Sequence, residues 1–164
     1  MKLVSYKNCW QQKASCPPPL NGKMLPSLTL TLLSDLFSVC QLAPDASIPP
    51  IQGGFFALVR TEDELSLVCR HDTAPETAKR QDGWCCLRFE GPFDFSLTGI
   101  LVAVAAPLAQ AKISIFALST FNTDYLLIPQ AQWQDAAIVL TNAGHHIKIS
   151  TPIEAPLPPD QTRG

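Results

Sequence analysis

The second half of the chain alternates between two hydrophobic periods. Short apolar runs bounded by turn residues predict four strands, and longer stretches with an apolar residue every three or four positions predict two helices. The predicted order is strand 84–90, helix 97–110, strand 113–119, strand 124–128, helix 130–143 and strand 146–149. This βαββαβ order is typical of an α+β fold with an antiparallel sheet.

The ends of both helices carry local signals. Ser96 precedes the first helix and is a good N-cap, because its hydroxyl can accept a hydrogen bond from a first-turn amide. Gly144 follows the second helix and supplies the left-handed residue that commonly ends one. We therefore expect both helices to pack one apolar face on the sheet.

The first half is less regular. Its apolar runs predict strands over 28–33, 37–42, 55–59 and 65–69. A short helical turn over 61–64 is predicted between the last two strands, with Thr61 as its N-cap.

Proline marks the ends of the chain. Four of its fifteen prolines precede residue 27 and four more follow residue 150, and such stretches favour extended backbone without a core. We expect an extended or disordered tail at 1–26, a first half at 27–72, a linker loop at 73–83, a second half at 84–150 and a Pro-rich tail at 151–164.

Composition and net charge limit the classes of binding partner that the sequence predicts. Charged residues make up 16% of the chain, against about 25% in a typical protein, so we expect part of the surface to be covered by a second copy or a larger protein. Residues 1–23 carry four lysines and no acid, and the remaining eight basic and fourteen acidic side chains give the rest a net charge of -6. A body of that sign repels a phosphate backbone, so no nucleic-acid partner is expected.

No segment predicts a membrane or secretory location. The longest apolar run, residues 100–109, is far shorter than the roughly 20 residues that cross a bilayer. The six cysteines show no C-x-x-C pair, so we interpret them as free thiols and expect neither a metal site nor a cofactor. A cytoplasmic location is the default expectation.

The residues between 91 and 128 hold the most informative pattern, because only Asp94, Lys112 and Asp124 are charged there. Free amides at a helix start suit a carboxylate. Asp94 and Asp124, with nearby hydroxyl and amide side chains, suit an ammonium or guanidinium group. The two together would fit a zwitterionic amino acid, although Asp94 and Asp124 could equally only shape turns.

Catalytic arrangements are harder to find. The three histidines are His71 in a loop and the pair His145 and His146 at a helix-to-strand corner, where a role at the helix C-terminus is the simpler interpretation. No G-x-S-x-G elbow or Gly-rich phosphate loop is present in the sequence. We therefore expect a protein that is not an enzyme.

Several long segments resemble a known family. The segments are 94–101 (DFSLTGIL), 111–120 (AKISIFALST) and 123–128 (TDYLLI), with shorter matches at 39–42, 54–56, 60–61 and 64–69. Together they resemble ACT-domain proteins of the type found in the cytosolic arginine sensor (CASTOR) and its small relatives. The resemblance covers about residues 28–149.

The resemblance implies two ferredoxin-like ACT-type halves, the first degenerate, with antiparallel sheets packed side by side. ACT modules bind amino acids between modules and relay occupancy to a partner, often as homodimers. The implied ligand-binding positions are Asp94, Phe95, Ser96, Leu97, Thr98 and Gly99 at the helix start and Ser119, Thr120, Phe121, Asn122, Thr123 and Asp124 at the hairpin. Thr61, Glu64 and Leu65 are implied as residues that close the pocket.

Three positions depart from the family pattern. Asn122 and Phe121 stand where many relatives carry aspartate and tyrosine, which weakens the case for a cationic ligand such as arginine. Lys112 stands where a glycine is common.

Two other functions remain open. One is a structural or protein-interaction module with a vacant pocket. The other is an accessory protein, or a small enzyme, of a specialised-metabolite pathway. The leading hypothesis is a regulatory module that binds an amino acid or similar small polar molecule without catalysis.

Overall fold

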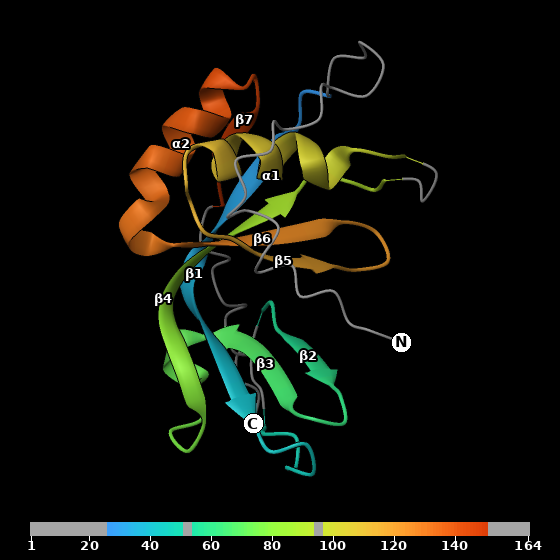
Figure 1. The fold of residues 1–164 in the computed structure, drawn as a ribbon, viewed down its shortest axis with the longest axis vertical. Helices are drawn as coiled ribbons and strands as arrows, with labels where there is room; N and C mark the ends of the chain where they lie inside the picture. The colour runs from blue at the N-terminus through green and yellow to red at the C-terminus, as the bar shows by residue number, and fades with distance from the viewer. Residues whose placement is uncertain (1–25, 51–53, 94–96, 151–164) are drawn as a thin grey trace, which may run out of the picture.

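The computed structural model describes residues 26–50, 54–93 and 97–150 (Figure 1). The elements are strands β1 (Thr29–Leu42), β2 (Ala57–Arg60) and β3 (Leu65–Arg70), 3-10 helix η3 (His71–Thr73), strand β4 (Lys79–Phe89), helix α1 (Ile100–Gln110), strands β5 (Phe116–Ser119) and β6 (Asp124–Pro129), 3-10 helix η4 (Gln130–Gln132), helix α2 (Trp133–Asn142) and strand β7 (His146–Ile149). The second half therefore has the predicted βαββαβ order.

The seven strands form one sheet in the order β2-β3-β1-β4-β6-β5, and β7 pairs with β1. Every pairing is antiparallel except that of β1 with β7. The α+β class is confirmed, but the expectation of two sheets packed side by side is wrong. The halves share a sheet because β1 and β4, with 14 and 11 residues, run through both of them.

Strand β1 is continuous where the sequence predicts two strands. The polar pair Ser34 and Asp35 favours a break, but the structure keeps both residues within the strand. The pairing of β1 with β4 shifts register between Leu32 and Leu36, so a local irregularity accommodates the polar residues without ending the strand.

The start of β1 also completes the sheet of the second half. Leu30 lies opposite Ile147 of β7 on one side and Phe89 of β4 on the other. In addition β4 begins at Lys79, within the predicted linker 73–83. The start of β1, within the predicted first half 27–72, thus pairs with strands of the predicted second half 84–150.

Helix α1 begins at Ile100, three residues later than predicted, after Gly99 with φ of 86°. The predicted N-cap, Ser96, lies outside the described residues. Lys112 after the helix has φ of 60°, a left-handed backbone conformation that favours glycine. Helix α2 begins at Trp133, after a 3-10 turn that the sequence predicts as helix.

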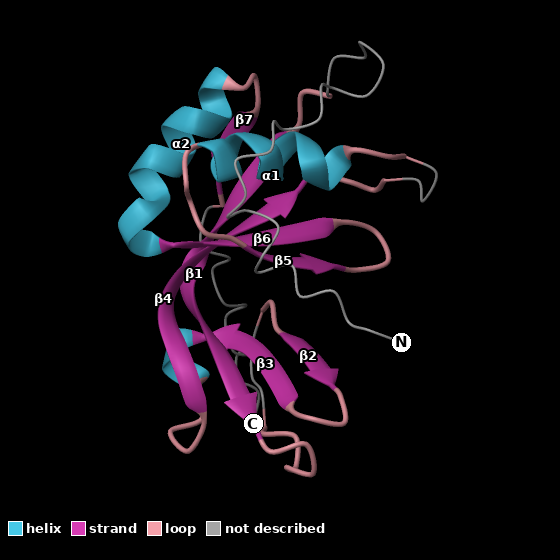
Figure 2. Ribbon diagram, in the orientation of Figure 1, coloured by secondary structure: helices cyan, strands magenta, loops and turns pink. Residues whose placement is uncertain are grey.

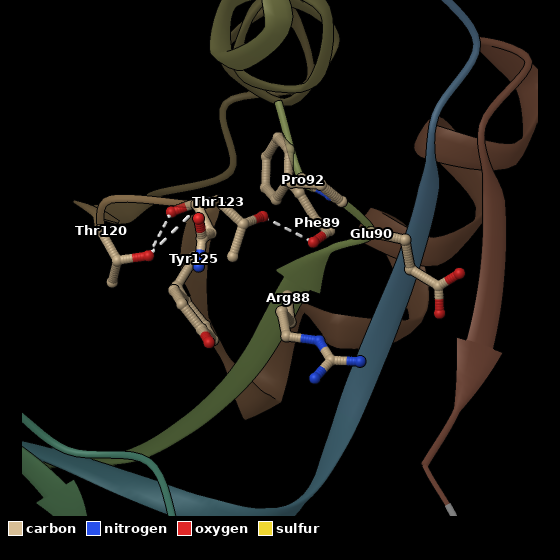
Figure 3. A pocket seen from close by; sticks show the side chains of 9 residues that line it. Arg88, Phe89, Glu90, Pro92, Thr120, Thr123 and Tyr125 are labelled. Atoms are coloured by element: carbon tan, nitrogen blue, oxygen red, sulfur yellow. Dashed lines mark hydrogen bonds between the residues drawn. The ribbon is translucent and has the colours of Figure 1, made fainter. Parts of the chain in front are cut away.

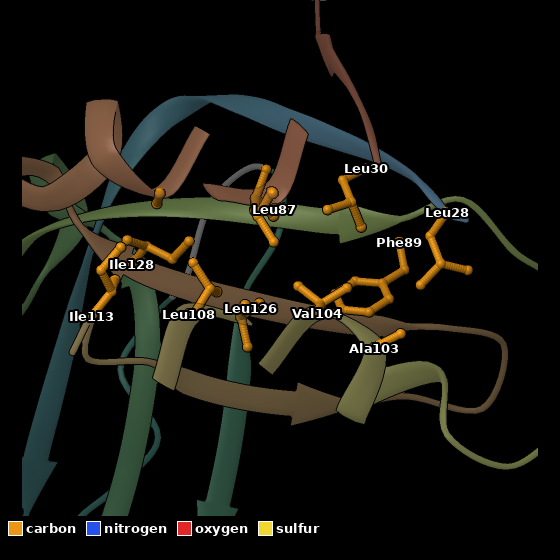
Figure 4. Close-up of a cluster of buried hydrophobic side chains, with 12 residues drawn as sticks. Leu28, Leu30, Leu87, Phe89, Ala103, Val104, Leu108, Ile113, Leu126 and Ile128 are labelled. Atoms are coloured by element: carbon orange, nitrogen blue, oxygen red, sulfur yellow. The ribbon is translucent and has the colours of Figure 1, made fainter. Parts of the chain in front are cut away.

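Both helices cover one face of the sheet (Figure 2). The main hydrophobic core fills the space between the helices and the sheet (Figure 4). Its buried members come from β1, β4, β6 and the helices, together with one residue just before β1 and one just after α1. They are Leu28, Leu30, Leu87, Phe89, Ala103, Val104, Leu108, Ile113, Leu126, Ile128, Ala136 and Leu140. Burying this apolar surface is the main force that holds the helices on the sheet.

On the other face of the sheet, residues from the two ends of the strand order come into contact. Phe37, Val68, Cys86 and Leu127, from four strands, form a second buried cluster there. Phe55, which precedes β2, stacks on Tyr125 of β6 with ring centroids 4.2 Å apart. Since β2 and β6 lie toward opposite ends of the strand order, this contact brings the two ends of the sheet together.

Candidate functional site

A small hollow lies between the approach to α1 and the hairpin that joins β5 to β6. Its volume is about 190 Å³. The residues that line it are Phe93, Leu97, Ile100, Ser119, Thr120, Phe121, Asn122, Thr123 and Asp124. The structure thus brings together seven of the predicted ligand-binding residues, and we call this hollow the hairpin hollow.

Asp124 is half-buried at the end of the hairpin, and its Oδ1 accepts a hydrogen bond of 2.6 Å from the Ser119 hydroxyl. Among the described residues, no group bonds its second oxygen, Oδ2. The expected turn-shaping role is therefore seen at Oδ1. The other oxygen remains able to accept a hydrogen bond from a ligand ammonium group.

The hairpin turn itself is held by its own polar groups. The Thr120 amide donates to the Thr123 carbonyl at 2.9 Å, and the Thr120 hydroxyl donates to the same carbonyl at 2.8 Å. These two hydroxyl-bearing residues, predicted as ligand contacts, thus have structural roles as well.

Two further contacts fix the hairpin against the end of β4. The Thr123 hydroxyl donates to the Phe89 carbonyl at 2.6 Å, and the Phe93 amide donates to the Asn122 carbonyl at 3.1 Å. The chain passes so close that a Cβ on Gly91 would lie 2.7 Å from the Asn122 carbonyl oxygen. Glycine at this position therefore allows the close approach of the hairpin to the chain after β4.

The first turn of α1 faces the hairpin hollow through Ile100. Within the described residues, no side chain caps this turn, and it contains no acidic residue. Its amides therefore keep the capacity to bind a carboxylate that the sequence predicts. Gly99 and Thr98 lie beside this turn without lining the hollow, whereas Asp94, Phe95 and Ser96 lie outside the described residues.

The predicted closing residues are elsewhere. Thr61 and Glu64 form the turn between β2 and β3, where the Thr61 hydroxyl accepts hydrogen bonds from the amides of Asp63 and Glu64. This turn replaces the predicted helical turn. Leu65 is fully buried opposite Leu42 of β1. None of the three predicted residues lines the hairpin hollow.

Phe93 and Ile100 line the hollow although sequence reasoning did not select them. Both flank the segment that it did select, and their apolar character gave no chemical signal. Leu97, 54% exposed, extends the same apolar wall to the rim. The wall suits an apolar part of a ligand.

The described histidines and cysteines lie away from this hollow. His145 is buried beside α1, and His71 bonds Ser38 and Asp82 near the other end of β1. Burial raises the pKa of Cys40 to about 11 and that of Cys86 to about 12, so these thiols are protonated at neutral pH. The described part of the chain holds no group of three metal-binding side chains and no helix able to cross a membrane.

Comparison with protein families gives two matches. A model of the ACT domain matches residues 79–142, and a model of another family's N-terminal domain matches residues 35–77. Together with the βαββαβ order and the two helices on one sheet face, the first match defines the class as an ACT-type α+β fold.

Individual relatives agree with that class. The human protein named cytosolic arginine sensor for mTORC1 subunit 1 is 32% identical over 130 residues, which cover 73% of this chain and 40% of that protein. The crystal structure of Atu0741 from Agrobacterium tumefaciens has a TM-score of 0.73 and 38% identity, over 77% of this chain and 96% of that one. The chain belongs to the ACT-domain proteins, and it is related to the cytosolic arginine sensors and to Atu0741.

A more distant structure shares the fold alone. The regulatory subunit of aspartate kinase from Thermus thermophilus has a TM-score of 0.51 and 14% identity, over 74% of this chain and 99% of that subunit. The chain itself spans about 40% of the length of the arginine sensors that it matches.

Proposed function

We propose that this protein is a non-catalytic regulatory module that binds an amino acid in the hairpin hollow and acts through a partner protein. The observation that carries the proposal is that Asp124 and the first turn of α1, which no described side chain caps, line one hollow. One relative supports a regulatory role, since it is named a cytosolic arginine sensor. That name also supports a cytoplasmic location.

The two ends of the hollow suit the two charges of an amino acid. The ligand carboxylate would accept hydrogen bonds from the α1 amides, where the helix dipole favours negative charge. The ammonium would donate to Oδ2 of Asp124. The ligand side chain would lie against Phe93 and Leu97, and a volume of about 190 Å³ with an apolar wall favours a small apolar side chain over that of arginine.

Thermal unfolding in the presence of each of the twenty amino acids tests this proposal. A ligand that binds only the folded state raises its stability, so millimolar concentrations of a small apolar amino acid should raise Tm. Asp124→Asn should abolish the rise in Tm, because it replaces the negatively charged carboxylate that would bind the ligand ammonium with a neutral amide. Asp45→Asn, which changes an exposed loop acid, should keep it. A protein whose Tm responds to none of the twenty would contradict the proposal.

A second candidate is an assembly role, and one observation favours it. Helix α1 contains no charged residue, and Val102 on its outer side is 57% exposed. Ile138 of α2 is 60% exposed as well. Surface helices are usually amphipathic, so this face suits a second copy or a larger partner. Light scattering checks it: a dimer that Val102→Glu converts to a monomer, with no response to amino acids, would favour assembly over sensing.

A further inference from the structure

Two larger hollows lie on the face of the sheet opposite the helices. Their volumes are about 680 and 700 Å³, and both are lined by Arg88 of β4 and Tyr125 of β6. They meet at these two residues, so we treat them as one groove and call it the sheet groove. Figure 3 shows Arg88 and Tyr125 in the first of the two hollows.

The strand register places a row of polar side chains across this face. Lys148 of β7 pairs with Thr31 of β1, Thr31 pairs with Arg88, and Arg88 pairs with Tyr125. Residues that are directly opposite in neighbouring strands present their side chains on the same face. Two cations and an aromatic ring therefore share one row.

The acidic groups near the row are already paired. Glu90 accepts a hydrogen bond of 2.7 Å from the Thr31 hydroxyl and one of 3.1 Å from the Lys148 ammonium. Figure 3 shows the Glu90 carboxylate beside β1. Lys148 is thereby neutralised.

The other guanidinium in the groove, that of Arg70, is paired too. It contacts Asp72 at 2.5 Å and Asp35 at 3.7 Å. The Arg88 side chain, by contrast, makes no hydrogen bond or close ion pair with any described residue, although its charge also acts on the Glu90 carboxylate. The sheet groove thus offers one unpaired guanidinium, whose planar fork matches a carboxylate.

The wall beside Arg88 is aromatic. Tyr125 and Phe55 stack with an interplanar angle of 22°, and both line the second hollow. Phe56 lines it as well and is 48% exposed. A flat apolar ligand can cover these rings and gain both burial and stacking.

We infer that the sheet groove is a second binding site, for a monoanionic carboxylate with an aromatic body. The carboxylate binds the Arg88 guanidinium through two parallel hydrogen bonds, and the ring of the ligand lies along Tyr125. A single unpaired cation matches one negative charge rather than a phosphate dianion. Both acids that line the groove, Glu90 and Asp35, are engaged, so nothing there favours a ligand ammonium. The preferred ligand is therefore an aryl acid without an amino group.

This site is separate from the hairpin hollow. Thr120, Asn122 and Thr123 line both the hairpin hollow and the first part of the sheet groove, so the hairpin stands between the two sites. The inference does not depend on the proposed amino-acid site, and each site has a variant that leaves the other one intact.

Isothermal titration calorimetry of the full chain tests the inference with three probes. Phenylacetate should bind, phenylacetamide should not because it lacks the charge, and acetate should bind at least about tenfold more weakly because it lacks the ring. Equal binding of phenylacetate and phenylacetamide would overturn the inference, as would the absence of heat with phenylacetate at millimolar concentration.

Variants locate the binding. Arg88→Gln should weaken phenylacetate binding at least about tenfold. The affinity of Arg88→Lys should lie between those of the unaltered protein and Arg88→Gln, because lysine keeps the positive charge but lacks the planar guanidinium. Lys79→Gln removes an exposed cation from the other end of β4 and should bind as the unaltered protein does. Asp124→Asn should also leave phenylacetate binding unchanged. If Arg88→Gln binds phenylacetate normally, or if Asp124→Asn loses it, the sheet groove is not the site.

Discussion

His145 joins three elements from a buried position. It is 3% exposed, and its Nδ1 accepts a hydrogen bond of 3.3 Å from the Leu28 amide, which leaves Nε2 to carry the proton and donate to the Ala103 carbonyl at 3.0 Å. One imidazole thus links the start of β1, helix α1 and the end of α2. A buried polar group in such a place contributes to stability only while both nitrogens are bonded.

We expect His145→Ala to lower the free energy of unfolding by about 2–4 kcal/mol, because it removes two buried hydrogen bonds and leaves a cavity. His146→Ala, which changes the exposed neighbour, should have little effect. Urea unfolding of the two variants measures the difference. Equal stabilities would show that His145 does not link these elements.

Glu90 makes stability depend on pH. The Thr31 hydroxyl, and then the Lys148 ammonium, hold the pKa of Glu90 below its ordinary value of 4.5. A carboxylate whose pKa is lowered on folding stabilises the protein above that ordinary value, and the contribution is lost as pH falls through the lowered pKa.

The stability difference between the unaltered protein and Glu90→Gln should therefore be larger at pH 7 than at pH 3. Thr31→Val removes the first donor but keeps the carboxylate, so it should remove part of this pH dependence. Urea unfolding at both pH values measures it. A difference that stays constant between pH 7 and pH 3 would contradict the assignment.

At the scale of elements, the turn after α2 depends on one glycine. Gly144 has φ of 89°, and no atom lies within 4 Å of the position where its Cβ would stand. Gly144→Ala should therefore cost about 1–2 kcal/mol through backbone strain alone. The control, Gly54→Ala, also meets no atom but has no left-handed backbone, so its effect should stay within about 0.5 kcal/mol. Thermal unfolding that shifts equally for both variants would contradict this explanation.

The second half was predictable as elements because its hydrophobic periods are regular. Strands β6 and β7 and helix α2 begin or end within a few residues of their predicted positions. Strand β1 was not predictable as one strand, because Ser34 and Asp35 interrupt its apolar pattern and pairing with β3, β4 and β7 keeps it extended. Leu30 pairs with Phe89 and Ile147, which lie 59 and 117 positions further along the chain, and no local pattern encodes such pairing.

The candidate site was predictable to a similar degree. The hairpin and the approach to α1 were selected because charged and hydroxyl-bearing residues are concentrated there in an apolar segment. The closing residues Thr61, Glu64 and Leu65 were placed on the assumption of two separate sheets, and one shared sheet puts them at a different hairpin. Arg88 and Tyr125 were missed because their proximity follows from strand register alone.

At the scale of the whole molecule, the shared strands should make unfolding cooperative. Cys40 and Cys69 are buried in a third cluster at the β2–β3 end, whereas both helices lie at the other end. Because β1 and β4 run through both ends, neither end can keep its pairing when the other unfolds.

We therefore expect one urea midpoint from two probes, the helical circular dichroism signal and the alkylation of Cys40 read by mass spectrometry. Alkylation should remain slow until the helical signal is lost, since burial protects the thiol and raises its pKa. Alkylation of Cys40 at urea concentrations that leave the helices intact would show that the two ends unfold separately.

The central claim is that an amino acid binds in the hairpin hollow, and amide NMR spectra of the labelled protein test it most directly. Titration with a small apolar amino acid should shift the amide signals of residues 97–101 and 119–124 together, with one dissociation constant, and Asp124→Asn should remove these shifts. Saturable shifts confined to another part of the molecule, or no shifts at millimolar ligand with any amino acid, would contradict the account.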